Sequence, residues 1–548
     1  MLLVNRRTAA ASKKPGTIAL ALLACGVLSF AAPASVATQL TDAEARGKLV
    51  YTKGQSQSNR VIRASISNAE APSSATILPC VQCHGENGRG IGIVSPAIDW
   101  DTLTDPEGHQ HPKREHGPFD EESLVDAITR GIDPAGNDFE VTMPKYIMAD
   151  EDMADLVAYL KVIGLEDDPA IVDGRIRIGT VLPEGGQHAG LGKAMRDTIE
   201  AVFSEVNAGG GVHGRELDLV VSSWEGNGDP EIWAAHDLVA KEPVIALVSP
   251  YIPNYDTELE TLATDEELPV VGPYTVLPPG DAGENRFSFY LLPGLELQAE
   301  ALVEAAAVLA PPSESTLAIV HPRVRFFDEI AEAARVRAEA LGFRSATVSV
   351  FEYGAFDGEN SAAAMRESGA DAIVFLGDSG ELGELARSAE TLDWHPYLLS
   401  PGVLAERGIF ELPASFSYRV LLSYASLPTD YSLSGAEEFE RLHEKYRFGY
   451  EYDIAQVSAF NAAKVLVAGL ENAGRRLTRE ELVLGLEEID EYHPGLAPPL
   501  SFGPFRRTGS MGAHIVRVDL VNDRFDPTTG WIALDESGEA EEPAEAQP

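Results

Sequence analysis

Cysteine is scarce in this chain of 548 residues, which contains only Cys25, Cys80 and Cys83. Cys25 lies in an N-terminal stretch that we expect to be removed on export, so two thiols remain. A structural zinc site needs four ligands, and the sequence has no second cysteine pair to complete one. A thioredoxin-like dithiol would need a βαβ context, and it does not require a histidine beside the second cysteine. The two remaining thiols therefore need another explanation.

Basic residues are also in short supply. The chain has 42 Lys and Arg residues against 86 Asp and Glu residues, which gives a formal net charge of −44. A polyanion repels phosphate groups, so this charge disfavours nucleic acid and anionic lipid as partners. Hydrophobic residues make up 44% of the chain, as in ordinary globular proteins, and we interpret the acidity as a solvated surface. The length predicts two to four domains.

Long apolar runs are confined to the N-terminus. Residues 1–37 combine a basic start, the apolar run "TIALALLACGVLSFAA" and the small residues "SVA" ending at Ala37, a pattern typical of an export signal. The run is too short and wrongly flanked for a membrane span. "LLAC" ending at Cys25 resembles a lipoprotein signal, so a lipid anchor at Cys25 is the alternative. We expect a periplasmic protein.

The two remaining cysteines stand in the stretch "ILPCVQCHGENGRG". Cys80, Cys83 and His84 form a C-x-x-C-H motif, which is the attachment signature of c-type haem. In such a site two thioether bonds hold the porphyrin, and the adjacent histidine ligates the iron. The motif predicts one covalently bound haem c.

Three methionines are candidates for the second axial ligand, in "VTMPKYIMADEDMADLVAYLKVIG". Met143 precedes a proline, which favours an extended loop able to reach a haem face. Met148 is the alternative ligand. A helix is expected from about Asp150, and Met153 would lie inside it as a core residue.

Residues 38–164 resemble class I c-type cytochromes, which are all-α. "EARGKLVYTKG" is similar to their N-terminal helix, "CVQCHG" to their attachment site and "MPKY…DMADLVAYLKVIG" to their ligand loop and C-terminal helix. The resemblance implies that Cys80 and Cys83 are the thioether sites, and that His84 and Met143 are the axial ligands of the haem iron. Histidine–methionine ligation closes both iron faces and suits electron transfer better than chemistry at the iron.

The sequence departs from a minimal cytochrome in two places. Residues 54–79 lengthen the approach to the haem motif, and "DPEGHQHPKREHGPFD" inserts His109, His111 and His116. We interpret the histidine-rich insertion as a polar surface loop. There are two alternatives: the three histidines bind a metal, or one of them replaces Met143 as the iron ligand. A short amphipathic helix should follow and end at Gly131.

The pattern changes after a polar linker at residues 165–174. Apolar strands such as "RIRIGTVLP", "VIALVSP", "TLAIVHP" and "DAIVFLGD" alternate with helical stretches near 191–206, 296–309, 327–341 and 380–391. This alternation predicts βαβ units and parallel sheets. About 360 residues suit two Rossmann-like lobes, with binding sites at the C-terminal ends of the strands.

Residues 175–534 resemble the solute-binding proteins of branched-chain amino acid and amide ABC transporters, which have the type I periplasmic binding fold. The resemblance is carried by "RIRIGTVLPEGGQHAGLGKAM", "EVNAGGGVHGREL", "GDPEIWAAHDLVAKEPVIALVSP" and "SAFNAAKVLVAGLENAGRRLTREELVLGLEEID". Proteins of this type are also known beside quinoprotein alcohol dehydrogenase systems. The sequence shows no catalytic triad, P-loop or metal signature here, so we predict that the protein is not an enzyme.

The resemblance also suggests where the solute binds. The family grips amino acid carboxylates with small hydroxylated residues, whereas the corresponding loop here reads "SPYIPNYDT". In the second lobe Glu381 occupies the place of an acid that pairs with a ligand ammonium. The damaged carboxylate grip puts α-amino acid binding in doubt and suggests a more aromatic cleft. The candidate solute-binding residues are Tyr251, Tyr255, Tyr274, Thr275, Phe326 and Glu381.

These features predict a periplasmic haem c electron-transfer protein with a fused domain that binds a small molecule, serving a periplasmic oxidation. The expected partners are that small molecule and a periplasmic redox protein, such as a dehydrogenase or another cytochrome. Two alternatives stay open. One is a solute receptor for an ABC permease with an accessory cytochrome, and the other is a redox or ligand sensor. Residues 535–548 are acidic, lack large hydrophobic side chains and are expected to be disordered.

Overall fold

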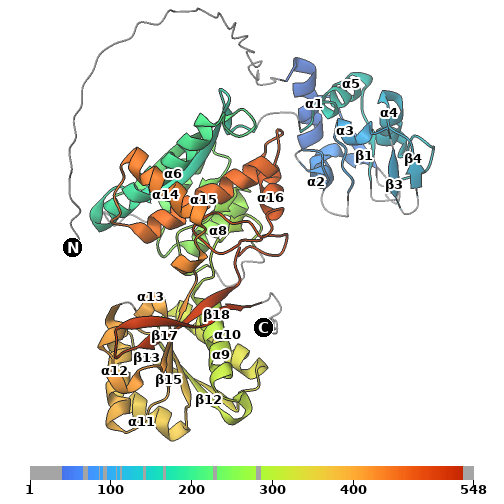
Figure 1. The fold of residues 1–548 in the computed structure, drawn as a ribbon. Helices are drawn as coiled ribbons and strands as arrows, with labels where there is room; N and C mark the ends of the chain where they lie inside the picture. The colour runs from blue at the N-terminus through green and yellow to red at the C-terminus, as the bar shows by residue number, and fades with distance from the viewer. Residues whose placement is uncertain are drawn as a thin grey trace, which may run out of the picture. The chain divides into compact units, whose positions relative to one another are not determined.

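The computed structural model describes residues 40–534 except 66–71, 86, 91–94, 107, 112–113, 140–142, 165–167, 226–230, 279–284 and 406. The predicted export signal, Cys25 and the acidic tail lie outside the described residues. Within the described ranges, no helix is long and apolar enough to cross a bilayer. Figure 1 shows the chain with its elements labelled.

The N-terminal domain is built around helices that surround one small core (Figure 1). Gly47 allows the first and last helices to pack closely, since a Cβ there would lie 2.0 Å from the carbonyl oxygen of Asp155. Arg46 donates two hydrogen bonds of 2.7 Å to Asp155 across the same contact. Met153 is 7% exposed within this core, which confirms its predicted role. The helices are α1 (Asp42–Lys53), α2 (Val81–His84), α3 (Trp100–Leu103), α4 (Glu121–Arg130) and α5 (Asp150–Leu160).

The two segments that depart from a minimal cytochrome form small sheets. Residues 54–79 supply β1 (Arg63–Ser65), β2 (Ser73–Ser74) and the 3₁₀ turn η1 (Ala75–Ile77), and β1 also pairs with β5 (Lys145–Ile147). The histidine-rich insertion is a hairpin of β3 (His109–His111) and β4 (Arg114–His116), with His109 opposite His116. The expected surface loop is therefore a self-paired hairpin. The predicted helix ending at Gly131 is α4, and Gly131 takes the left-handed conformation (φ 71°) that ends it.

The first lobe of the second domain is a parallel sheet with an antiparallel start. Its parallel strands are β7 (Arg175–Pro183), β8 (Glu216–Trp224), β9 (Leu247–Val248), β10 (Val270–Val271) and β11 (Ser288–Phe289). The short β6 (Ile171–Val172), inside the expected linker, pairs antiparallel with β7. The helices of this lobe come from two parts of the chain: α6 (Ala189–Ala208), α7 (Ile232–Lys241) and α8 (Asp256–Asp265), then α14 (Leu433–Tyr446), α15 (Asp453–Asn472) and α16 (Arg479–Glu487).

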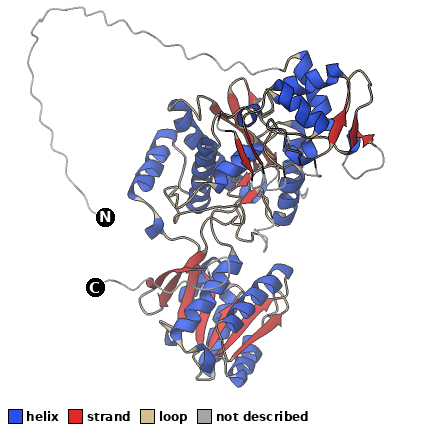
Figure 2. Ribbon diagram, turned by 90° about the vertical axis from the view of Figure 1, so that its right-hand side faces the viewer, coloured by secondary structure: helices blue, strands red, loops and turns tan. Residues whose placement is uncertain are grey.

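The second lobe is a seven-stranded mixed sheet with helices on both faces, which Figure 2 shows as a red sheet between blue helices. One buried cluster joins α9 (Leu295–Leu309) and α10 (Arg325–Ala340) to the sheet, and another joins α11 (Gly358–Ser368) and α12 (Ser379–Thr391) to its other side. The chain leaves this lobe after β16 (Val420–Tyr424) and returns at residue 512 as an antiparallel pair of strands. The strands are β12 (Thr316–Pro322), β13 (Ser345–Phe351), β14 (Ala372–Phe375), β15 (Tyr397–Pro401), β16 (Val420–Tyr424), β17 (Gly512–Asp519) and β18 (Arg524–Ala533).

The main helices of this lobe are α9 (Leu295–Leu309), α10 (Arg325–Ala340), α11 (Gly358–Ser368) and α12 (Ser379–Thr391). Three of them, α9, α10 and α12, begin and end within two residues of the predicted stretches, whereas α11 was not among the predicted helices. Helix α6 extends the predicted 191–206 helix by two residues at each end. The architecture confirms the predicted fold class: a helical cytochrome domain followed by two α/β lobes with parallel strands.

Candidate functional site

The C-x-x-C-H motif forms a single helical turn, α2, preceded by Cys80. Cys80 is half-buried, Cys83 is exposed, and neither is in a disulfide. The Nδ1 atom of the buried His84 lies 3.0 Å from the carbonyl oxygen of Pro96. Because a carbonyl only accepts, Nδ1 carries the ring proton and donates, which leaves the Nε2 lone pair free to bind iron. The residues present therefore fit haem c.

Burial supports this protonation state. It lowers the pKa of His84, and the neutral imidazole is the form that ligates a metal. Burial also raises the pKa of the Cys80 thiol to about 11, so the free thiol is protonated at neutral pH.

Hydroxyl groups hold the backbone on both sides of the motif. Tyr51 donates a 2.6 Å hydrogen bond to the carbonyl oxygen of Gly85, and Tyr146 donates one of 2.7 Å to that of Leu78. The Ser95 hydroxyl donates to the carbonyl oxygen of Cys83. Since these carbonyls flank the haem-binding residues, the bonds fix the turn that presents Cys80, Cys83 and His84.

The methionines differ in their surroundings. Met143 is half-buried, lies in a bend directly before β5 and is not part of the helical core cluster. Met148 packs against that cluster and Met153 lies within it. Met143 is thus the one methionine of the three that does not pack in the core cluster, and it stays the predicted ligand. The His116 ring bonds the Gly117 carbonyl through Nδ1 at 2.8 Å, whereas the side chains of His109 and His111 lie outside the described set.

Four aromatic side chains meet at the carboxyl ends of the parallel strands in the first lobe. His188 follows β7, Trp224 ends β8, Tyr251 follows β9 and Tyr274 follows β10. Tyr251 lies at the centre of this aromatic wall, with ring centroids 6.0 Å from His188, 6.3 Å from Trp224 and 5.5 Å from Tyr274. Trp224 Nε1 donates a 3.2 Å hydrogen bond to the Tyr251 carbonyl. Sequence reasoning named both tyrosines but missed His188 and Trp224, whose signal was their position at strand ends.

The neighbouring polar residues are largely engaged with each other. The Thr275 hydroxyl accepts from the Leu277 amide at 2.9 Å and donates to Asp256. Burial raises the pKa of Asp256 to about 6, although the Thr275 bond opposes this. Tyr255 precedes α8 and packs, half-buried, against the core of its lobe. Ser249 has φ 44° and a buried hydroxyl that has no partner among the described residues.

The second lobe contributes two of the predicted residues. Phe326 is 37% exposed in the first turn of α10, beside Phe327, and lines a hollow of about 370 Å³ together with Asn254, Asp256 and Leu277. Glu381 lies in the first turn of α12, where its carboxylate accepts a 3.1 Å hydrogen bond from the Asp378 amide and so closes a capping box. A ligand ammonium at Glu381 would have to share this carboxylate with the cap.

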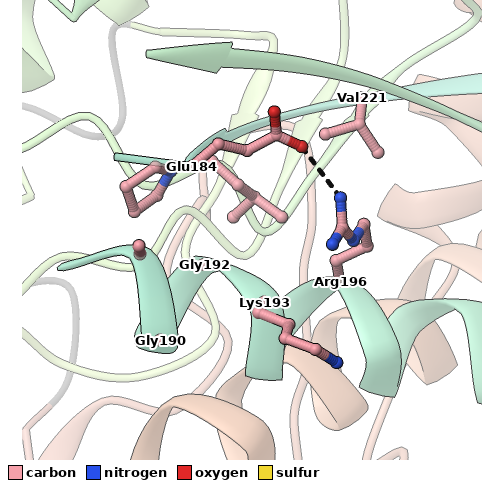
Figure 3. A pocket seen from close by; sticks show the side chains of 9 residues that line it. Glu184, Gly190, Gly192, Lys193, Arg196 and Val221 are labelled. Carbon is pink, nitrogen blue, oxygen red and sulfur yellow. Dashed lines mark hydrogen bonds and ion pairs between the residues drawn. The ribbon is translucent and has the colours of Figure 1, made fainter. Parts of the chain in front are cut away.

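A second hollow, of about 400 Å³, lies along the start of α6 (Figure 3). Its lining includes Glu184 and Arg196, which form a 2.8 Å ion pair, and Lys193, which pairs with Asp197. Since these charges neutralise each other, the lining offers a solute no unpaired charged side chain.

Residues 175–524 match the periplasmic binding protein family, and residues 75–163 match the cytochrome c family. The chain therefore belongs to the periplasmic binding protein family and carries a cytochrome c domain ahead of the binding fold. A cytochrome c domain implies haem c.

Solved structures of similar fold include a branched-chain amino acid ABC transporter protein from Rhodospirillum rubrum (16% identity, TM-score 0.53, 65% of this chain and 100% of that one). Another is a branched-chain amino acid ABC transporter protein from Thermus thermophilus with bound valine (17% identity, TM-score 0.51, 66% and 96%). An amino acid binding protein of Pseudomonas aeruginosa is 22% identical over 235 residues, which span 42% of this chain and 60% of that protein. These likenesses show the fold alone.

Proposed function

We propose that this protein is a periplasmic one-electron carrier with a built-in clamp for a small molecule, and that it serves a periplasmic oxidation. The observation that carries the proposal is the orientation of the His84 imidazole. His84 directly follows Cys83, and the hydrogen bond from its Nδ1 to the Pro96 carbonyl leaves Nε2 available for iron. Cys80 and Cys83 would hold one covalent haem c, and His84 and Met143 would be its axial ligands. The haem supplies one-electron exchange.

The chain's own residues favour a carrier over a catalyst. If His84 and Met143 were both to ligate the haem iron, no coordination position would be left for a substrate. Cys83 is exposed, so the edge of the haem attached there would lie near the protein surface, where a redox partner can approach. That partner would be a periplasmic dehydrogenase or another cytochrome.

The clamp would hold its solute against the aromatic wall. In support, Tyr251 and Tyr274 follow β9 and β10, and ligands of open α/β sheets bind outside the carboxyl ends of the strands. The further candidates are Tyr255, Thr275, Phe326 and Glu381. The aromatic wall replaces the hydroxyl groups that grip an amino acid carboxylate, and Glu381 is already used in a helix cap. We therefore propose a small solute other than an aliphatic α-amino acid. A receptor for an ABC permease is the second candidate, favoured by the fold of the solved structures.

A two-stage experiment on the full-length, haem-loaded protein tests this proposal. Thermal shift is first measured with L-leucine, L-valine, benzamide, benzoate and benzamidine. The reduction potential is then titrated with and without the compound that stabilises the protein most. Reversible one-electron cycling, with stabilisation by an aromatic probe and none by leucine or valine, supports the proposal. Tight binding of leucine or valine favours the ABC receptor, and failure to cycle reversibly contradicts the carrier.

A further inference from the structure

Two segments that precede the haem motif, residues 54–65 and 72–79, contact the chain that follows Met143. We call these two segments the brace. Its strand β1 pairs antiparallel with β5, so that Ala64 lies opposite Tyr146. β5 begins two residues after Met143. The brace thus supplies the only strand partner of β5 within the described residues.

A charged contact fixes the brace to the next helix. Arg60 donates two hydrogen bonds of 2.8 Å to Asp152 in the first turn of α5, and Ser56 donates a third of 2.7 Å. Asp152 is only 3% exposed, and its pKa is lowered chiefly by the Arg60 hydrogen bonds. Paired hydrogen bonds between a guanidinium and a carboxylate are among the stronger polar contacts in proteins.

A third contact joins β5 to the haem-binding turn itself. The Tyr146 side chain is 7% exposed, and its hydroxyl donates to the carbonyl oxygen of Leu78, two residues before Cys80. The brace is held to itself as well, through the hydrogen bond of 3.1 Å from the Ala75 amide to the Ile62 carbonyl. Backbone pairing, an ion pair with a buried carboxylate and a tyrosine hydroxyl therefore tie the chain directly after Met143 to the segments before the haem motif.

We propose that the brace positions the Met143 loop and limits how readily Met143 exchanges for an external ligand. This inference rests on the proposed His84–Met143 ligation. Replacement of the methionine requires the loop to open, and contacts made only in the closed loop favour the closed state. An external ligand that binds only the open form gains apparent affinity in proportion to the open population. Arg60 and Tyr146 are thus positioning residues.

Imidazole binding to the full-length, haem-loaded ferric protein tests the proposal. Arg60→Gln removes the charged contact, and Tyr146→Phe removes the hydroxyl while keeping the ring. We expect imidazole to bind about tenfold more tightly to R60Q and about threefold more tightly to Y146F, from the usual strength of charged and neutral hydrogen bonds. The matched control is Arg130→Gln, which removes the exposed 2.8 Å pair with Asp126 on α4. It should bind imidazole as the wild type does.

A near-infrared band from the methionine–iron bond provides the second readout. R60Q and Y146F should keep this band without imidazole and lose it at lower imidazole concentration than the control. Unchanged imidazole affinity in both variants, with the band lost in Met143→Ala, overturns the brace alone. A band that survives in Met143→Ala contradicts the ligand assignment and the brace together.

Discussion

Glu260 on α8 provides a test of how burial controls the pH stability of the binding domain. Its carboxylate is half-buried and accepts a 2.9 Å hydrogen bond from the Tyr290 hydroxyl. Burial raises its pKa from 4.5 to about 7, and the charge of Asp256 adds to this effect. The folded protein therefore binds this proton more tightly than the unfolded chain does. The contribution of the protonated Glu260 side chain to the unfolding free energy is fully present below pH 4.5 and is lost as pH rises to about 7.

The size of the loss follows from the two pKa values. The difference between 4.5 and about 7 sets an upper bound of about 3 kcal/mol, and because Glu260 is only partly buried we reduce this to about 1.5 kcal/mol. Glu260→Gln removes the charge but keeps an oxygen that accepts from Tyr290. Relative to the wild type, the variant should gain about 1.5 kcal/mol of unfolding free energy on going from pH 4.5 to pH 8.

Urea unfolding of the haem-loaded protein at pH 4.5, 6 and 8 measures this difference. Tryptophan fluorescence reports mainly on the binding domain, which holds four of the five tryptophans: Trp224, Trp233, Trp394 and Trp531. The matched control is Glu258→Gln, an exposed residue on the same helix. If the stabilities of E260Q and the wild type stay parallel between pH 4.5 and pH 8, the argument from burial is wrong.

Three further predictions concern the haem and its link to the clamp. Replacing Cys80 and Cys83 together with alanine should abolish covalent haem, measured by the haem stain of a denaturing gel; full haem retention would contradict the attachment site. Met143→Ala should remove the near-infrared band and leave the haem attached, whereas Met148→Ala should keep it. The opposite pattern would make Met148 the ligand, and loss of the band in neither variant would point to the histidine hairpin. A bound solute should shift the reduction potential by less than about 60 mV, equivalent to under tenfold in affinity for one electron. A larger shift in a spectroelectrochemical titration would favour the sensor over the carrier.

Local patterns in the sequence were enough to predict most elements. The haem motif is a contiguous string, so its chemistry needs no tertiary information. The helix ending at Gly131 was predicted because an amphipathic stretch followed by glycine describes a complete local structure. The alternation of strand and helix likewise predicted both lobes, since each βαβ unit is built from neighbouring residues.

Contacts between distant residues were not predictable in this way. The aromatic wall unites His188, Trp224, Tyr251 and Tyr274 across 87 positions, and only the parallel register of β7 to β10 brings their strand ends together. Glu381 was assigned from its place in a family pattern, but whether its carboxylate is free depends on the Asp378 amide beside it.

A haem-attachment motif followed by a two-lobed α/β fold could be predicted from the amino-acid sequence alone, because both are encoded in short, regularly spaced patterns. Folding of the chain was needed to show that Nδ1 of His84 is engaged and Nε2 is the nitrogen left for a metal, because the carbonyl that bonds Nδ1 belongs to Pro96, twelve residues away. The tertiary structure also decided that the added segment before the motif packs against the strand after Met143. Pairing between Arg60 and Asp152 joins residues 92 positions apart, and such contacts exist only once the chain has folded.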